Sequence, residues 1–242
     1  MTKYYPIMLN IEEKKCTVVG GGRVAERKVK SLLEHGAVVT VMSPTLTDAL
    51  QEMVRQGQLL HHQKHYETGD LRGSYLVYVA TDDLQVSQAC HEEASRENIL
   101  MNVVDVPRLC DFTVPAIVRR GPLTVAIASD GKSPMLSRKI REELEKRFGQ
   151  HYEDVLELLG EMRVQALNEI NEIEDRKQLF QQLIYEHDVE NLGKKGKEIL
   201  WREAWQFYEA FKKQLKGCDK NENNKNRIKS QSAGPSSSRN HY

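Results

Sequence analysis

Three small residues near the start of the chain have the spacing of a dinucleotide-binding turn. Gly20, Gly22 and Ala25 fill the pattern Gly-x-Gly-x-x-Gly/Ala directly after a β-branched run. In this pattern the first glycine allows a tight turn, the second lets the backbone approach a pyrophosphate, and the third small residue lets a helix pack on the sheet. The pyrophosphate would meet the N-terminus of the helix that opens with Arg23 and Val24. The pattern predicts a dinucleotide site, although a domain that had lost its ligand would keep the same turn.

The residues after the second predicted strand leave the choice of nucleotide open. An NAD-binding domain commonly has an acidic residue there for the ribose hydroxyls, whereas this chain has Ser43 and Pro44. The Ser43 hydroxyl can hydrogen-bond a ribose hydroxyl. Arg23 can receive the extra phosphate of NADP, or be a solvated residue of the first helical turn.

One carboxylate is placed to take part in a reaction. Asp105 follows a predicted parallel strand, at the edge where open α/β sheets bind ligands, and a carboxylate there can accept a proton. Thr81 and Asp82 follow the fourth predicted strand and are expected to border the cofactor, whereas Asp83 is expected to cap the next helix. On residue chemistry alone, a structural turn or N-cap role explains Asp105 equally well.

The chain shows no recognised metal-ligand spacing, so no metal site is predicted. His61, His62 and His65 lie near a strand end and are predicted to be surface residues. The four cysteines contain no Cys-x-x-Cys pair, which predicts reduced thiols rather than a structural zinc or disulfides. These cysteines are Cys16, Cys90, Cys110 and Cys218.

A parallel sheet with crossover helices is needed to position these residues. Short β-branched runs alternate with amphipathic runs from Lys15 to Asn102, which is α/β ordering. The first helix is expected to end at Gly36 in a left-handed conformation. The predicted strands span residues 15–19, 37–42, 59–62, 75–80 and 100–104.

The pattern changes after residue 111. Strand-like runs over residues 112–118 and 123–128 flank a turn, which predicts a hairpin, and Ser133 with Pro134 predicts the start of a helix. The chain is then helical in pattern to about Leu215, with Gly193 and Gly196 as interruptions. The predicted parts are a Rossmann domain over residues 1–111, a hairpin-helix domain over 112–150, a helical domain over 151–216 and a disordered tail over 217–242.

Composition excludes several classes of protein. Lysine plus arginine and aspartate plus glutamate each number 35, so the overall charge gives no argument for binding nucleic acid or an anionic membrane. No stretch approaches the roughly 20 apolar residues needed to span a bilayer, and the N-terminus has no signal-peptide pattern. These observations predict a cytoplasmic protein.

Five blocks of the sequence carry a resemblance to a known family. They are Thr17–Lys28, Ala80–Asp83, Asn102–Pro107, Phe112–Pro115 and Ser129–Pro134. In this order they resemble the precorrin-2 dehydrogenase family of sirohaem synthesis, which includes sirohydrochlorin ferrochelatases. The resemblance covers residues 1 to about 165. The fused bacterial enzymes carry a methyltransferase domain for which this chain has no matching segment, so the resemblance is to the free-standing type.

The resemblance implies a reaction and an assembly. Members of the family oxidise precorrin-2 to sirohydrochlorin with NAD as hydride acceptor, some also insert Fe²⁺, and they act as intertwined homodimers, which makes residues 112–150 a dimerisation domain. Asp105 matches the functional aspartate of the family. An additional chelatase activity stays open, and a regulatory module that senses NAD(H) is an alternative of a different class.

Because such a substrate carries many carboxylates, basic side chains and helix N-termini are expected to bind it. Ser129 to Ser133 precede a helix and can present backbone amides to a carboxylate. A solvated basic helix face would have a similar composition. The candidates for substrate binding are Arg119, Arg120, Ser129, Lys132, Ser133 and Arg138.

Overall fold

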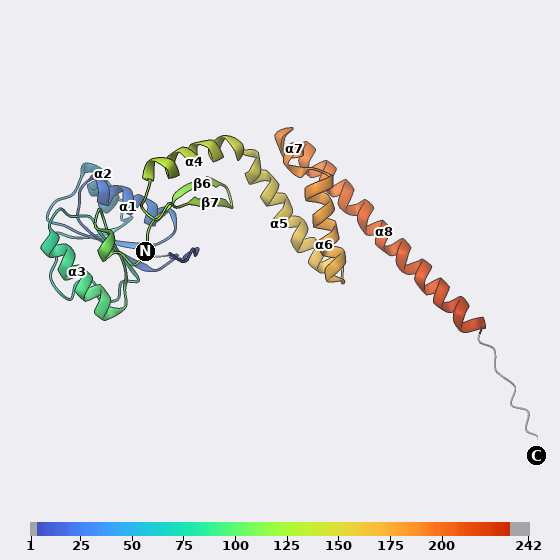
Figure 1. Cartoon of the computed structure of the whole chain (residues 1–242), viewed down its shortest axis with the longest axis horizontal. Helices are drawn as coiled ribbons and strands as arrows, with labels where there is room; N and C mark the ends of the chain where they lie inside the picture. The colour runs from blue at the N-terminus through green and yellow to red at the C-terminus, as the bar shows by residue number, and fades with distance from the viewer. Residues whose placement is uncertain (1–3, 233–242) are drawn as a thin grey trace, which may run out of the picture. The chain divides into compact units, whose positions relative to one another are not determined.

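The computed structural model describes residues 4–232, with side chains through Lys216. Contacts divide the chain into two compact units, with the division between Val114 and Pro115, and each unit is described by itself (Figure 1). The finer domain boundaries expected from the sequence stay predictions. Among the described residues, no helix is long and apolar enough to cross a membrane.

The first unit is a parallel sheet with flanking helices, which confirms the predicted fold class. Its five strands are β1 (Lys15–Val19), β2 (Val38–Met42), β3 (Leu60–His62), β4 (Leu76–Val79) and β5 (Leu100–Val103). They lie in the order β3-β2-β1-β4-β5, and every neighbouring pair is parallel. The helices are α1 (Arg23–Glu34), α2 (Asp48–Arg55), α3 (Leu84–Glu97) and the short 3-10 helix η1 (Pro107–Leu109).

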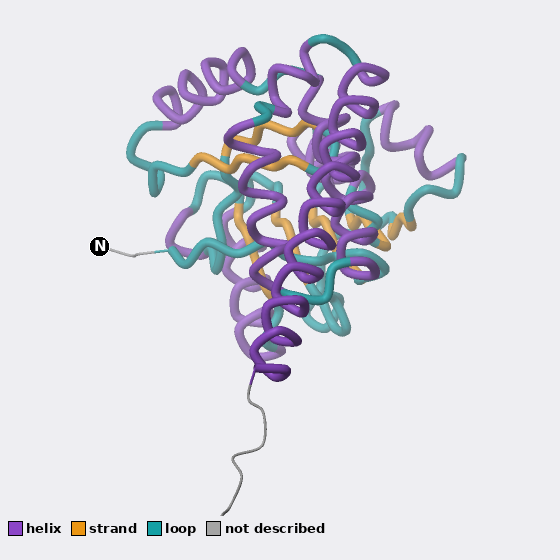
Figure 2. Tube along the Cα trace, turned by 90° about the vertical axis from the view of Figure 1, so that its right-hand side faces the viewer, coloured by secondary structure: helices purple, strands orange, loops and turns teal. Residues whose placement is uncertain are grey.

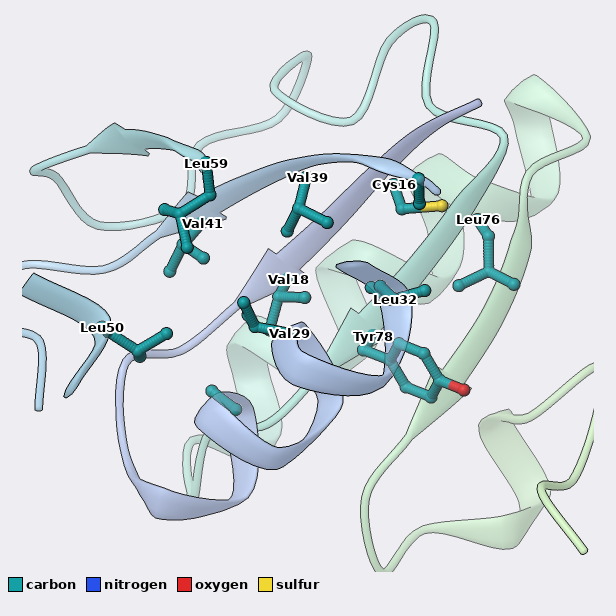
Figure 3. Close-up of a cluster of buried hydrophobic side chains, with 12 residues drawn as sticks. Cys16, Val18, Val29, Leu32, Val39, Val41, Leu50, Leu59, Leu76 and Tyr78 are labelled. Carbon is teal, nitrogen blue, oxygen red and sulfur yellow. The ribbon is translucent and has the colours of Figure 1, made fainter. Parts of the chain in front are cut away.

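Helices cover both faces of this sheet. Successive side chains of a strand point to opposite faces, so Tyr78 packs with α1 and α2 while its neighbours Val77 and Val79 pack with α3. Figure 3 shows the first of these clusters, with Val18, Val29 and Tyr78 between the sheet and α1. Burial on both faces explains why the strands read as continuous apolar runs.

The first helix begins and ends where the sequence predicts. Ala25, Val29 and Leu32 recur every three or four residues and are buried against the sheet. Gly36 has a φ of +74° and its N–H bonds the carbonyl of Leu33, so the predicted left-handed residue after the helix is confirmed.

The second unit begins with an antiparallel hairpin, which confirms that prediction. The hairpin joins β6 (Ala116–Arg120) to β7 (Leu123–Ile127). Strand β6 begins at Ala116, whereas the sequence predicts a start at Phe112. The difference arises because Asp111 hydrogen-bonds Met101 of β5 and Phe112 packs edge-on against Tyr78. Ser133 caps α4 (Pro134–Arg147) by accepting the N–H of Leu136, as predicted.

Helices form the rest of the second unit and pack side by side, as Figures 1 and 2 show. They are α5 (His151–Glu169), α6 (Ile173–Gln181), the π-helix η2 (Gln182–Glu186), α7 (Val189–Lys194) and α8 (Lys197–Ser232). Their core includes Leu158, Met162, Leu200 and Tyr208, all fully buried.

Helix α8 differs from the expected boundary at its far end. It continues to Ser232, into the segment predicted to be disordered. A composition poor in apolar residues limits what a segment can bury, but adding residues to a helix that is already anchored avoids the cost of nucleation. Residues 233–242 of the predicted tail lie outside the described residues.

Candidate functional site

The turn between β1 and α1 needs glycine at two positions for packing. Gly20 has a φ of +119°, and a Cβ atom there would lie 2.2 Å from the carbonyl oxygen of Ala80, just past the end of β4. A Cβ atom at Gly21 would lie 1.9 Å from the carbonyl oxygen of Thr45 in the loop after β2. The Gly-x-Gly-x-x-Gly/Ala pattern assigns no role to Gly21, and the run of three glycines is the signal in the sequence that points to it.

Gly22 is different, because a Cβ atom there would meet no protein atom within 4 Å. Its φ of −85° is open to any residue, so packing and backbone conformation do not explain a glycine at this position. It is the N-cap of α1 and makes no side-chain cap, while the first helical bond runs from Glu26 to its carbonyl. The amides of Arg23 and Val24 therefore have no partner within the helix. An open space beside free helix amides fits a pyrophosphate.

Two side chains beside this helix end suit different roles. Arg23 is exposed, and within residues 4–216 it makes no hydrogen bond or ion pair. Glu26 bonds Lys30 at 2.6 Å and accepts the Thr47 hydroxyl at 2.9 Å, and the bond to Lys30 is the main reason that the pKa of Glu26 is lowered. Glu26 thus ties α1 to the loop after β2, and Arg23 is the side chain available to an anion.

Ser43 is buried next to the glycine turn, with its hydroxyl oxygen 2.8 Å from where a Cβ of residue 21 would lie. The residue is 7% exposed, and its hydroxyl donates to the carbonyl of Thr45 at 2.8 Å. The Nε2 atom of His61 lies 2.9 Å from the Ser43 carbonyl, which places His61 in a structural contact. Ser43 therefore shapes the loop that contacts Gly21, an arrangement that strand periodicity did not reveal.

A cavity of about 440 Å³ lies behind the loop after β2. Pro44 forms part of its wall with Thr45 and Leu46, and α2, β3 and the residue after β3 supply the rest. No lysine or arginine lines it; the further lining residues are Gln51, Val54, His61 and Gln63.

The loop after β4 borders the glycine turn through the contact between Gly20 and Ala80. Thr81 is half-buried and its hydroxyl oxygen accepts the N–H of Asp83 at 3.3 Å. Asp83 accepts the N–H groups of Gln85 and Val86, which confirms that it caps α3. Asp82 is exposed at the same loop.

Asp105 follows β5 in an unusual conformation. Its φ is +60°, a left-handed value that costs a non-glycine residue energy and that occurs often at functional sites. The side chain is exposed and makes no hydrogen bond or ion pair within the described part of the chain. The carboxylate is thus left available to a ligand.

Strand order places these residues along one edge of the sheet. Parallel strands end at the same edge, so the loops after β1, β2, β4 and β5 lie there together. In the order β3-β2-β1-β4-β5 the connections reverse direction between β1 and β4, which is where open α/β sheets bind ligands. The predicted cofactor residues and Asp105 are therefore brought to one edge.

The candidates for substrate binding all lie in the second unit, and Arg120 has a structural role there. Its guanidinium donates to the carbonyls of Phe148 at 2.9 Å, Glu145 at 3.1 Å and Arg119 at 2.7 Å. Two of these carbonyls belong to the C-terminal end of α4, so Arg120 caps that helix. Sequence alone gave no sign of this contact, which spans more than twenty residues.

The other candidates surround the start of α4. The Ser129 hydroxyl donates to the Ser133 carbonyl at 3.1 Å and accepts the Ser137 hydroxyl at 2.9 Å, which fixes the loop. Arg138 pairs with Glu142 at 2.9 Å on the exposed face of the helix. Arg119 and Lys132 are exposed. Within the described residues, no group of three or more histidine, cysteine, aspartate or glutamate side chains could hold a metal ion.

A glycine turn that leaves room for a ligand at the reversal point of a parallel sheet defines a dinucleotide-binding protein of the Rossmann class. A family model described as "Putative NAD(P)-binding" matches residues 7–116, and one described as "Sirohaem biosynthesis protein central" matches residues 120–147. These two matches, together with the relatives described next, group the chain with proteins of sirohaem biosynthesis.

Individual relatives agree with this assignment. The siroheme synthase of Photobacterium profundum is 37% identical over 74% of this chain and 38% of its own length. The siroheme synthase of Pseudoalteromonas atlantica is 44% identical over 59% of this chain and 31% of its own length. The chain thus spans less than two fifths of each of these relatives. A solved structure of SirC, precorrin-2 dehydrogenase, has a TM-score of 0.71 and 27% identity, and the match covers 87% of this chain and 100% of that chain.

Proposed function

We propose that the chain is an NAD-dependent precorrin-2 dehydrogenase that forms sirohydrochlorin in sirohaem synthesis. The observation that carries the proposal is the position of Asp105, an exposed carboxylate without a partner in the described residues, on the same sheet edge as the open turn at Gly22. The likeness to SirC over most of the chain supports this substrate. It also disfavours a purely regulatory module that binds NAD(H).

The residues of the first unit hold the cofactor and receive a proton. NAD, when bound, supplies the acceptor for the hydride that leaves precorrin-2. Gly22 and the amides of Arg23 and Val24 bind its pyrophosphate, and the loops at Pro44 and Thr81 border its remaining parts. Asp105 accepts the proton that precorrin-2 loses with the hydride and, being exposed, releases it to water.

The second unit binds the carboxylates of the substrate in this proposal. Arg119, Lys132 and Arg138 are exposed cations that can form charge-assisted hydrogen bonds with acetate and propionate groups. Ser129 and Ser133 act indirectly, because their hydroxyls hold the loop that leads into α4. Arg120 is left out of this set, because its donors are occupied at the end of α4.

We also propose that the chain acts as a homodimer through residues 116–147. Val118 is the one buried apolar residue of this segment, whereas Met135 is 73% exposed and Leu136 is 51% exposed. The hairpin packs on α4 and α5 within the chain, and a second copy of the segment would cover the apolar side chains that stay exposed. Sedimentation equilibrium tests this assembly: a monomer at micromolar concentration refutes the dimer.

The cytoplasm is the proposed location of the reaction. Cys16 and Cys90 are buried as free thiols, and burial raises the pKa of Cys16 to about 11 and of Cys90 to about 12, which keeps both protonated. Their state agrees with a reducing compartment.

The test is anaerobic turnover of precorrin-2 with NAD⁺, followed by NADH absorbance. Asp105→Asn keeps the size of the side chain and suits a left-handed residue, so it should lower kcat by about 10²-fold or more while NADH binding is unchanged. Asp48→Asn, at an exposed carboxylate in the first turn of α2, is the matched control and should keep full activity. No NADH formation by the folded parent protein refutes the proposed function.

A further inference from the structure

Strand β5 is an edge strand whose outer side has no neighbouring strand among the described residues. It pairs with β4 alone, and its bonds to β4 leave the backbone groups of Met101 and Val103 facing outward. Outward-facing groups of an edge strand are normally paired with water or covered by other structure. Here they are covered by the segment that returns after the Asp105 turn.

Asp111 pairs with Met101 in the manner of a neighbouring strand. The Met101 N–H donates to the Asp111 carboxylate at 2.9 Å, and the Asp111 N–H donates to the Met101 carbonyl at 2.8 Å. The adjacent Asn102 side chain donates to the carbonyl of Phe112 at 2.9 Å. These bonds fix the point at which the chain returns to the sheet.

The thiol of Cys110 pairs with the outward-facing backbone groups of Val103. The Val103 N–H donates to Cys110 Sγ at 3.2 Å, and the thiol has the carbonyl oxygens of Val103 at 3.2 Å and Val106 at 3.4 Å as acceptors. Burial raises the pKa of the Cys110 thiol, so at neutral pH it keeps the proton that it donates. One small side chain therefore contacts both ends of the stretch that contains Asp105.

Backbone hydrogen bonds also constrain this turn. The Val104 N–H, directly before Asp105, bonds the carbonyl of Val79 in β4 at 2.9 Å. After Asp105, the Val106 N–H bonds the carbonyl of Val103 at 3.4 Å and the Leu109 N–H bonds the carbonyl of Val106 at 3.0 Å, so both use carbonyls that the thiol also contacts. Leu109 is buried in the core next to Val103 and Met101. Between them Asp105 holds a strained φ of +60°, which persists only where the surroundings enforce it.

We propose that Cys110 is a positioning residue, whose thiol closes the loop from Val103 to Val106 and thereby fixes the Asp105 carboxylate for the reaction. The inference rests on the proposed function for its catalytic consequence, but the closing of the loop is a property of the chain itself. A loosened loop displaces the carboxylate, and a displacement of about 1 Å can reduce a rate by up to about 10²-fold.

Two variants at one position test the proposal. Cys110→Ala removes the donor and the acceptor, whereas Cys110→Ser keeps both in a smaller group. Amide hydrogen exchange of residues 104–109 should become at least about tenfold faster in Cys110→Ala, since the opening of a local segment governs this exchange. Cys110→Ser should recover most of the protection. Cys16→Ala, which removes a fully buried thiol in the separate cluster on the other face of the sheet, is the matched control and should leave exchange at 104–109 unchanged.

The kcat distinguishes a positioning role of Cys110 from a purely structural one. In Cys110→Ala the kcat for precorrin-2 oxidation should fall about tenfold while the Kd for NADH stays unchanged. Unchanged exchange at residues 104–109 overturns the proposal, and so does faster exchange with an unchanged kcat. If the parent protein oxidises no precorrin-2, the proposed function fails, while the exchange measurement still decides whether Cys110 closes the loop.

Discussion

Tyr66 donates a hydrogen bond of 2.5 Å to the carboxylate of Glu93, a side chain that is 1% exposed. The same carboxylate accepts the N–H groups of Gly69 at 2.8 Å and Leu71 at 2.9 Å, so it organises the long connection between β3 and β4. Burial and the bond to Glu93 raise the pKa of Tyr66 far above its ordinary value, so the phenol remains a donor. A buried carboxylate is tolerated here because donors surround it.

Glu93→Gln should lower the free energy of unfolding by about 2–3 kcal/mol, because the amide NH₂ would face donors that need an acceptor. Tyr66→Phe is the milder comparison and should cost about 1 kcal/mol. Urea denaturation measures both. A loss for Glu93→Gln within about 0.5 kcal/mol, the range of ordinary surface substitutions, would contradict a structural role for this carboxylate.

Gly21 and Gly22 of the turn should respond differently to alanine. Gly22→Ala should fold normally, because its Cβ meets nothing, but should weaken NADH binding at least about tenfold by filling the space for the pyrophosphate. Gly21→Ala should fail to fold or lose several kcal/mol of stability, since its Cβ would overlap the carbonyl of Thr45. Thermal unfolding and fluorescence titration separate the two effects. Equal NADH affinity in Gly22→Ala would place the pyrophosphate elsewhere.

Arg120 should matter for stability rather than for substrate affinity. Arg120→Met should cost about 2 kcal/mol, because the carbonyls at the end of α4 lose a charged donor, while the KM for precorrin-2 stays within about twofold of the parent value. Arg138→Gln should show the reverse, since its ion pair with Glu142 is exposed and contributes little. A large rise in the KM for precorrin-2 in Arg120→Met, without a rise in Arg138→Gln, would mean that Arg120 contacts the substrate.

Glu190 should make the second unit sensitive to acid. A hydrogen bond from Arg147, with further ones from Tyr152 and Lys194, lowers its pKa from 4.5 to about 2. Since the pKa of the folded state is depressed, this contribution to stability is complete above about pH 4.5 and disappears as the pH falls toward 2.

We therefore expect Glu190→Gln to cost about 1 kcal/mol near neutral pH, a value kept small because the partners are partly exposed. The difference from the parent protein should shrink steadily below about pH 4.5. Urea denaturation at a series of pH values measures it. A difference that is constant with pH would mean that the charge of Glu190 contributes nothing.

Local patterns predicted much of the fold because they depend on neighbouring residues. The strand at residues 15–19, the left-handed Gly36 and the caps at Asp83 and Ser133 each follow from residues a few positions apart. The start of β6 was not predicted correctly, because the residues before it hydrogen-bond to β5. The side chains of Asp111 and Cys110 accept N–H groups of β5, as a neighbouring strand would, and strand periodicity does not reveal such contacts.

The candidate site was predicted in part for the same reason. The roles of Gly20 and Gly22 follow from the glycine pattern and the order of elements. The need for glycine at residue 21, the burial of Ser43 and the contacts of Arg120 depend on residues more distant in the sequence or on loops without a regular pattern. Residue types give the chemistry that is available, and tertiary contacts decide which side chains are already occupied.

The glycines of the turn differ in what constrains them, and this difference affects how related sequences can diverge. Gly20 and Gly21 are held by packing, so a lineage that replaces them loses its fold. No packing contact constrains Gly22, so under the proposed function the nucleotide alone does, and we expect its replacement to leave the fold intact. A single substitution at residue 22 is therefore the shortest route from an enzyme to a folded descendant that no longer uses a nucleotide. In a related sequence, the residue that follows the two packed glycines is the first position to inspect for lost activity.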